Sequence, residues 1–119
     1  MTPGSDKIYR LNKLIEFIGD DTASVTNMVG VFLHSTPDLV DQIRQGFADN
    51  DLVKVGKAAH MLKPTLDIFG IDSMYDTIRA IELNAKNMEH LDQLGDQINA
   101  LSNELDRVYA QIKTDFPTA

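Results

Sequence analysis

The chain contains no cysteine and no tryptophan, and only four of its 119 residues are proline. Without cysteine there can be no disulfide framework, thiolate metal site or thiol nucleophile, so the chemistry has to come from oxygen and imidazole groups. No apolar run approaches the roughly 20 residues that cross a bilayer, and residues 1–6 contain no apolar signal segment. We therefore expect a cytoplasmic protein without membrane contact.

Basic residues are also scarce: 11 Lys and Arg stand against 18 Asp and Glu, which gives a net charge of −7. Such a charge repels phosphate backbones, so nucleic acid is not an expected partner. Hydrophobic residues make up 43% of the chain, enough to build one core at this length. We expect residues 1–119 to form one monomeric domain, with residues 1–6 disordered.

Helical periodicity dominates the chain, and no alternating β-branched run bounded by turn residues marks a strand. Periodic segments predict helices over residues 7–18, 22–35, 37–47, 52–69, 72–85 and 91–112. Thr36 is expected to cap the third segment with Pro37 at its first helical position, and Asp72 or Ser73 to cap the fifth. Because short loops favour antiparallel neighbours, the predicted fold is all-α: an antiparallel up-and-down four-helix bundle with one or two additional short helices.

One histidine stands out on the predicted helix 52–69. The apolar stripe of this helix has the 4, 3, 4, 3 spacing of a buried face and consists of Val55, Ala59, Leu62, Leu66 and Phe69. His60 points about 100° away from that stripe, so we expect an exposed imidazole. Lys57 and Lys63 lie three residues before and after it, on neighbouring turns. An imidazole that is mostly neutral at pH 7, beside two cations, suits the uptake of an anionic phosphoryl group.

The segment Ala59-His60-Met61-Leu62-Lys63, followed by Gly70 ten residues after the histidine, resembles the signature of histidine-containing phosphotransfer domains. The resemblance covers nearly the whole chain. Further similar positions are Phe32-Leu33, Thr36-Pro37, Leu39, Ile43 and Asp51 before the histidine, and Ile81-Glu82 and Ala85 after it.

The resemblance implies a phosphorelay intermediate. His60 would accept a phosphoryl group from the aspartate of one receiver domain and pass it to another, while Lys63 would help to hold the phosphoryl oxygens. The implied partners are receiver domains of response regulators, including that of a hybrid histidine kinase. The chain has no glycine-rich nucleotide loop and no Mg²⁺ cluster, so we expect no cofactor and no autonomous kinase activity. The receiver would supply Mg²⁺.

Two residues depart from the family pattern. Pro64 stands where the family most often has glycine, and its missing N–H and its ring predict a kink that costs about 3 kcal/mol. The apolar stripe keeps its phase across Pro64, so we expect a bent but continuous helix. Asp67 stands on the face of His60 where the family usually has a small residue, and is expected to pair with Lys63 or to be solvated.

The expected partner-binding surface surrounds His60 and extends to a neighbouring helix. It consists of Val53, Gly56, Lys57, Pro64 and Asp67, together with Met28 and Phe32, which belong either to the core or to a docking patch. His34 and His90 lack ligand partners at recognisable spacing, so no metal site is predicted.

Two alternatives to phosphotransfer stay open. The chain could be a phosphorylation-incompetent bundle that binds a receiver or another protein as an adaptor, if Pro64 or Asp67 spoils the transfer geometry. It could also be a purely structural bundle, in which case replacing His60 and Lys63 would change neither binding nor signalling.

Overall fold

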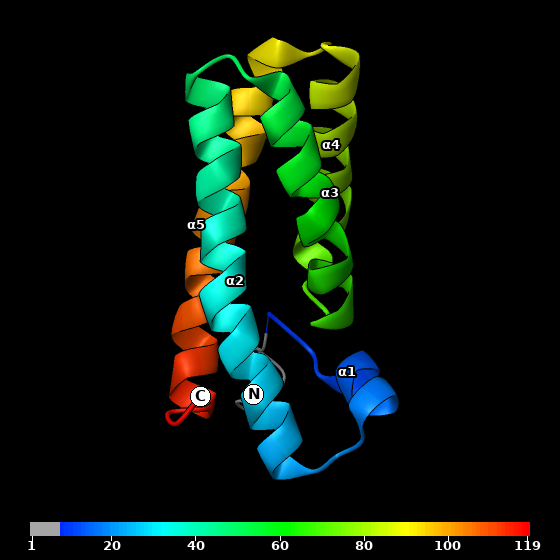
Figure 1. The fold of residues 1–119 in the computed structure, drawn as a ribbon, viewed down its shortest axis with the longest axis vertical. Helices are drawn as coiled ribbons and strands as arrows, with labels where there is room; N and C mark the ends of the chain where they lie inside the picture. The colour runs from blue at the N-terminus through cyan, green and yellow to red at the C-terminus, as the bar shows by residue number, and fades with distance from the viewer. Residues whose placement is uncertain (1–7) are drawn as a thin grey trace.

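The computed structural model describes residues 8–119, and within that range all regular structure is helical, as predicted (Figure 1). The expected disorder of residues 1–6 and the predicted helix start at residue 7 lie outside the described residues. The elements are α1 (Asn12–Ile18), α2 (Thr22–Ala48), α3 (Leu52–Ile68), the 3₁₀ turn η2 (Asp72–Met74), α4 (Tyr75–Asn87) and α5 (Leu91–Asp115). No helix in this range has the length and apolar character to cross a membrane.

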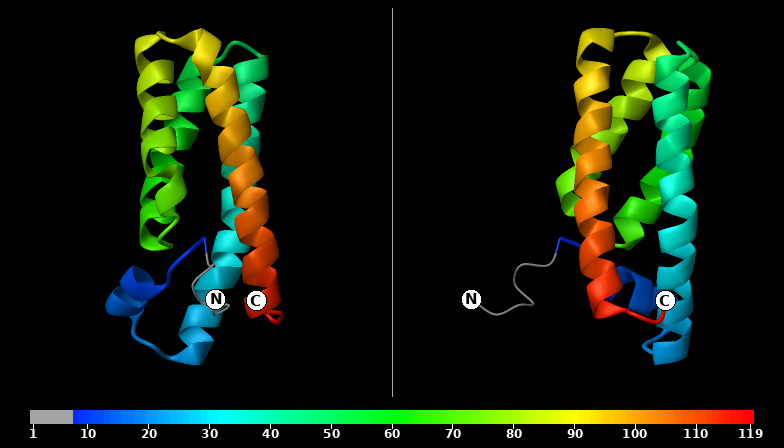
Figure 2. Two further views of the ribbon diagram at one scale, coloured as in Figure 1. Left: turned by 180° about the vertical axis from the view of Figure 1, so that it is seen from behind. Right: turned by 90° about the vertical axis from the view of Figure 1, so that its left-hand side faces the viewer.

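The four longer helices lie side by side, and their neighbours in sequence run in opposite directions (Figures 1 and 2). α2 packs against α3 and α5, and α4 packs against the same two helices from the other side. Their apolar stripes meet in one core, whose most fully buried members include Val29, Ile43, Val55, Leu62, Ile78, Ile81, Leu94, Leu101, Leu105 and Val108. α3 and α4 are thus adjacent antiparallel helices, and their outer seam can carry side chains from both.

α2 is one continuous helix where two were predicted. Thr36 is fully buried, and its hydroxyl donates to the carbonyl oxygen of Phe32 (2.7 Å) and also contacts the hydroxyl of Tyr109 (2.8 Å). This hydroxyl therefore bonds back to the preceding turn and does not cap a new helix. Pro37 lies inside α2, a helix that packs against both α3 and α5. The predicted cap at Thr36 is wrong because tertiary packing overrides the local proline signal.

The first helix is shorter than predicted, and the residues before it form a strap across the ends of other helices. Tyr9 is buried and its hydroxyl bonds to Asp115 at the end of α5. The Arg10 N–H donates to the carbonyl of Phe69 (2.8 Å), directly beside Gly70, whose φ of 62° lies in the left-handed region. A Cβ on Gly70 would come within 2.7 Å of the Cβ of Arg10. Glycine at this position therefore allows both the left-handed backbone and the close approach of Arg10.

The predicted N-cap of the segment 72–85 also needs correction, and α1 is less buried than the longer helices. Little of α1 is buried: Ile15 and Ile18 are exposed, and Leu14 is its only buried residue. Neither predicted cap serves α4: the N-cap position is Met74, and the side chain of Asp72 pairs with Arg10. α1 and the turn before α4 are short segments, so contacts with residues distant in sequence set their environment.

Candidate functional site

His60 lies in the middle of α3, and its side chain is 69% exposed, as the position of the apolar stripe predicts. The stripe itself is buried from Val55 to Leu66. α3 continues through Pro64 to Ile68, which confirms the predicted continuity of the helix. Because proline has no N–H, the carbonyl of His60 lacks the donor that a regular helix would supply four residues later.

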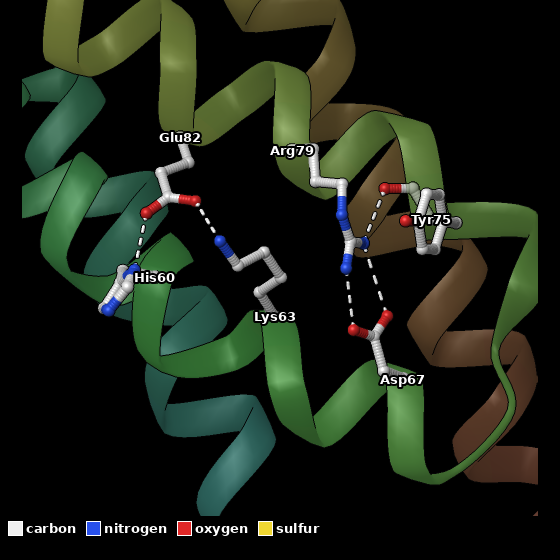
Figure 3. A network of polar contacts seen from close by, with 6 residues as sticks. All are labelled: His60, Lys63, Asp67, Tyr75, Arg79 and Glu82. Atoms are coloured by element: carbon white, nitrogen blue, oxygen red, sulfur yellow. Dashed lines mark hydrogen bonds and ion pairs between the residues drawn. The ribbon is translucent and has the colours of Figure 1, made fainter.

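Glu82 on α4 holds both His60 and Lys63 (Figure 3). One carboxylate oxygen, Oε2, lies 2.6 Å from Nδ1 of His60, and the other, Oε1, accepts a hydrogen bond from Nζ of Lys63 at 2.8 Å. The hydrogen bond from Lys63 lowers the pKa of Glu82 below its ordinary value, and the bond from His60 adds to this effect, while partial desolvation opposes it. Glu82 is therefore a stable anion at neutral pH, with both oxygens engaged.

This contact defines which ring nitrogen of His60 is available for chemistry. A carboxylate only accepts hydrogen bonds, so Nδ1 beside Glu82 carries the ring proton. In the neutral form of the ring the other nitrogen, Nε2, has a free lone pair, and it points away from both Glu82 and Lys63 (Figure 3). In that form the ring is an exposed nucleophile, and the positive charge that it would carry after reaction would face the carboxylate of Glu82.

Lys63 and Asp67 make different contacts from those expected. The ammonium of Lys63 is bound to Glu82 and does not pair with Asp67. Asp67 pairs instead with Arg79 on α4, which donates to both of its oxygens, at 2.7 Å and 3.3 Å. Arg79 also donates to the carbonyl of Tyr75 and lies over its ring (Figure 3). The negative charge of Asp67 is therefore neutralised within the seam between α3 and α4.

A groove of about 520 Å³ opens between α3 and α4 beside His60. Three residues predicted to surround His60 line it, namely Val53, Gly56 and Lys57. Pro64 and Asp67 do not, because they lie further along α3 in the other direction. The groove wall also contains apolar side chains from both helices and the loop after α4, including Leu52, Met61, Ala85 and Met88.

Met28 and Phe32 do not lie beside His60. Phe32 is 1% exposed and stacks on Phe69 at the end of α3, with ring centroids 4.3 Å apart. His60 precedes Phe69 by nine residues, which is about 13 Å along the helix axis. Met28 is half-buried one turn further away along α2. Of the two interpretations left open for these residues, the core is the correct one for Phe32, because a buried ring cannot contact a partner.

The sequence pattern predicts no site role for three charged residues of the seam, namely Arg79, Glu82 and Lys86, although Glu82 is at a position similar to the family. Their spacing of three and four residues places them on one face of α4, next to its buried stripe. That spacing is a usable signal for a polar face, but it does not reveal which helix lies opposite. No cluster of three His, Cys, Asp or Glu within residues 8–119 could hold a metal ion.

A family model of the Hpt domain matches residues 27–111, which span all of α3 and α4 and most of α2 and α5. No curated protein and no solved structure matches the chain.

Proposed function

The chain belongs to the Hpt-domain family, and from that membership we propose that it is a phosphorelay intermediate with His60 as its phosphoryl acceptor. Hpt domains carry phosphoryl groups in two-component signalling, interact with receiver domains, and are carriers rather than catalysts. The observation that supports His60 most directly is its exposed ring with Nδ1 held 2.6 Å from Glu82. His34 and His90 have no comparable contact among the described residues.

The proposed domain is the antiparallel four-helix bundle formed by α2 to α5, and it acts as a monomer. One accessible histidine on the surface of one bundle needs no second copy to complete its site. The expected location is the cytoplasm, where receiver domains act.

The proposed reaction begins with the lone pair of Nε2 of His60 attacking the phosphorus of a receiver's aspartyl phosphate. The N–P bond forms as the P–O bond to the aspartate breaks, and the aspartate leaves as a carboxylate. The proton on Nδ1 stays in place, so the ring becomes an imidazolium whose charge faces the carboxylate of Glu82. The reverse sequence passes the group to the aspartate of the next receiver.

Positioning and charge neutralisation provide most of the rate in such a transfer, because its transition state is loose. In the proposed division of labour the receiver brings the aspartate and Mg²⁺. This chain brings an oriented imidazole and its counterion, and needs no cofactor of its own.

The test is incubation with phosphorylated receiver domains and Mg²⁺, followed by measurement of acid-labile, alkali-stable phosphate on the chain. We expect label on the wild type and none on His60→Gln, because glutamine removes the nucleophile while it preserves helix propensity. His34→Gln is the matched control and should label as the wild type does. Binding of receivers without any label would instead support the adaptor function, and label that persists on His60→Gln would exclude His60 as the acceptor.

A further inference from the structure

Charged side chains across the seam between α3 and α4 are paired by opposite sign, with one exception. Asp67 on α3 pairs with Arg79 on α4, and the next pair toward the start of α3 joins Lys63 to Glu82. Each pair places an acid on one helix opposite a base on the other (Figure 3). The exception follows at the next position along the seam.

Lys57 and Lys86 occupy that position. A Cβ built on Gly56 would lie 3.9 Å from the Cβ of Ala85, so residues 56 and 85 are opposite each other across the seam and the two lysines are their immediate neighbours. Both lysines are exposed, both line the groove, and neither forms an ion pair with a described residue. The only acid in the groove wall is Glu82, whose two oxygens are already taken.

Two like charges on facing helices repel each other unless an anion lies between them. This concentration of positive charge is notable in a chain with a net charge of −7. Elsewhere along the seam each base lies opposite an acid. By the same pattern, Lys57 and Lys86 would be balanced by a negative group at the rim of the groove.

His60 can supply that group. Its ring lines the same groove as the two lysines, and Nε2 points away from Lys63 (Figure 3). Lys57 lies one turn before His60 on α3, so both side chains project from the same face of the helix. A phosphoryl group on Nε2 carries a charge of roughly −2 at pH 7 and would lie on the side of the ring away from Lys63 (Figure 3).

We propose that Lys57 and Lys86 are the residues that bind the phosphoryl group of His60, and that Lys63 is a positioning residue that acts through Glu82. This inference rests on the proposed function and deepens it. It assigns the neutralisation of the phosphoryl oxygens to the groove side of the histidine. It assigns the orientation of the ring to the pair formed by Lys63 and Glu82.

The experiment uses phosphoramidate, a small donor that needs no docking surface. Nε2 forms its bond to phosphorus as the P–N bond of the donor breaks, and the already protonated amine leaves as ammonia. The labelling rate is measured on the wild type, Lys57→Met, Lys86→Met, the double variant, Lys63→Met and the control Lys113→Met. Methionine retains the aliphatic stem of lysine and its helix propensity, so helix content by circular dichroism should be unchanged.

We expect the rate to fall about threefold in each groove variant and about tenfold in the double variant, while Lys113→Met labels as the wild type does. The wild-type rate should fall with rising ionic strength, and the double variant should lose most of this dependence because its two cations are gone. Lys63→Met should keep the salt dependence.

Wild-type labelling rates in the double variant would overturn the assignment of Lys57 and Lys86 while leaving His60 as the acceptor. So would a salt dependence that is lost in Lys63→Met and retained in the double variant. Absence of label on the wild type itself would contradict the proposed function, and this inference with it.

Discussion

The carboxylate of Glu82 lies 2.6 Å from Nδ1 of His60, so the orientation of a ring on α3 is set by a residue on α4. The same carboxylate binds Lys63 at 2.8 Å through its second oxygen. Both contacts depend on the register between two helices. A shift of one helix along the other by a single turn would separate the ring from its counterion.

Replacing Glu82 by glutamine should slow phosphoryl transfer to His60 by about tenfold without unfolding the domain. The amide still accepts a hydrogen bond, but it no longer balances the imidazolium charge and it releases Lys63. The check is the initial rate of labelling from a phosphorylated receiver, with circular dichroism to verify the fold. A wild-type rate in Glu82→Gln would show that the carboxylate has no part in the transfer.

Acidification should remove a stabilising contribution that Glu82 makes at neutral pH. Its pairing with Lys63 and His60 holds the pKa of Glu82 below the ordinary value of 4.5. The contribution is therefore complete above pH 4.5 and is lost as the pH falls through the lower folded-state pKa. We expect the wild type to have a higher free energy of unfolding than Glu82→Gln at pH 6. This difference, measured by urea unfolding, should become smaller as the pH is lowered to about 3. A difference that widens on acidification would contradict the lowered pKa.

The pair formed by Asp67 and Arg79 should stabilise the fold and leave phosphoryl transfer unchanged. Both side chains are about one-third exposed, so we expect a coupling energy of about 0.5–1 kcal/mol. A double-mutant cycle with Asp67→Asn and Arg79→Met, followed by urea unfolding, measures this value. Faster transfer in Asp67→Asn would mean that its charge opposes the phosphoryl group, contrary to its neutralisation by Arg79.

Pro64→Ala should make the domain more stable, because alanine restores an N–H that can donate to the carbonyl of His60. The gain in the helix is partly offset by the greater freedom of the unfolded chain, which leaves a net increase of about 1–2 kcal/mol. Thermal and urea unfolding test this value. The side chain of Pro64 does not line the groove, so the labelling rate of His60 should change little. A loss of stability would show that the turn after His60 requires proline.

Gly70→Ala should destabilise the domain by about 3 kcal/mol, because it combines a left-handed backbone with a clash. The added Cβ would lie 2.7–2.9 Å from atoms of Arg10. Gly19→Ala is the matched control, since Gly19 also has a positive φ of 85° but no atom within 4 Å of the added group. We expect that control to lose only about 1 kcal/mol. An equal loss of unfolding free energy in the two variants would contradict a close contact between residue 70 and Arg10.

The sequence by itself determined the helical class, both ends of α3, the start of α5, and the exposure of His60. These properties are local, because the phase of an apolar stripe states which face of a helix is buried, and His60 lies off that stripe. The phase of the stripe also predicted correctly that α3 continues across Pro64. The proline signal at Pro37 was misleading, since a buried hydroxyl contact of Thr36 with Tyr109 joins α2 to a helix 73 residues away.

Only the tertiary structure decided the partners of the charged residues. The antiparallel register of α3 and α4 brings Glu82 to His60 and Arg79 to Asp67. It also places Lys86 in the same groove as Lys57. Helical periodicity predicts the direction in which a side chain points around the helix axis. It does not predict the position of one helix along another. That position is set by the packing of the shared core, and the chemistry of the seam depends on it.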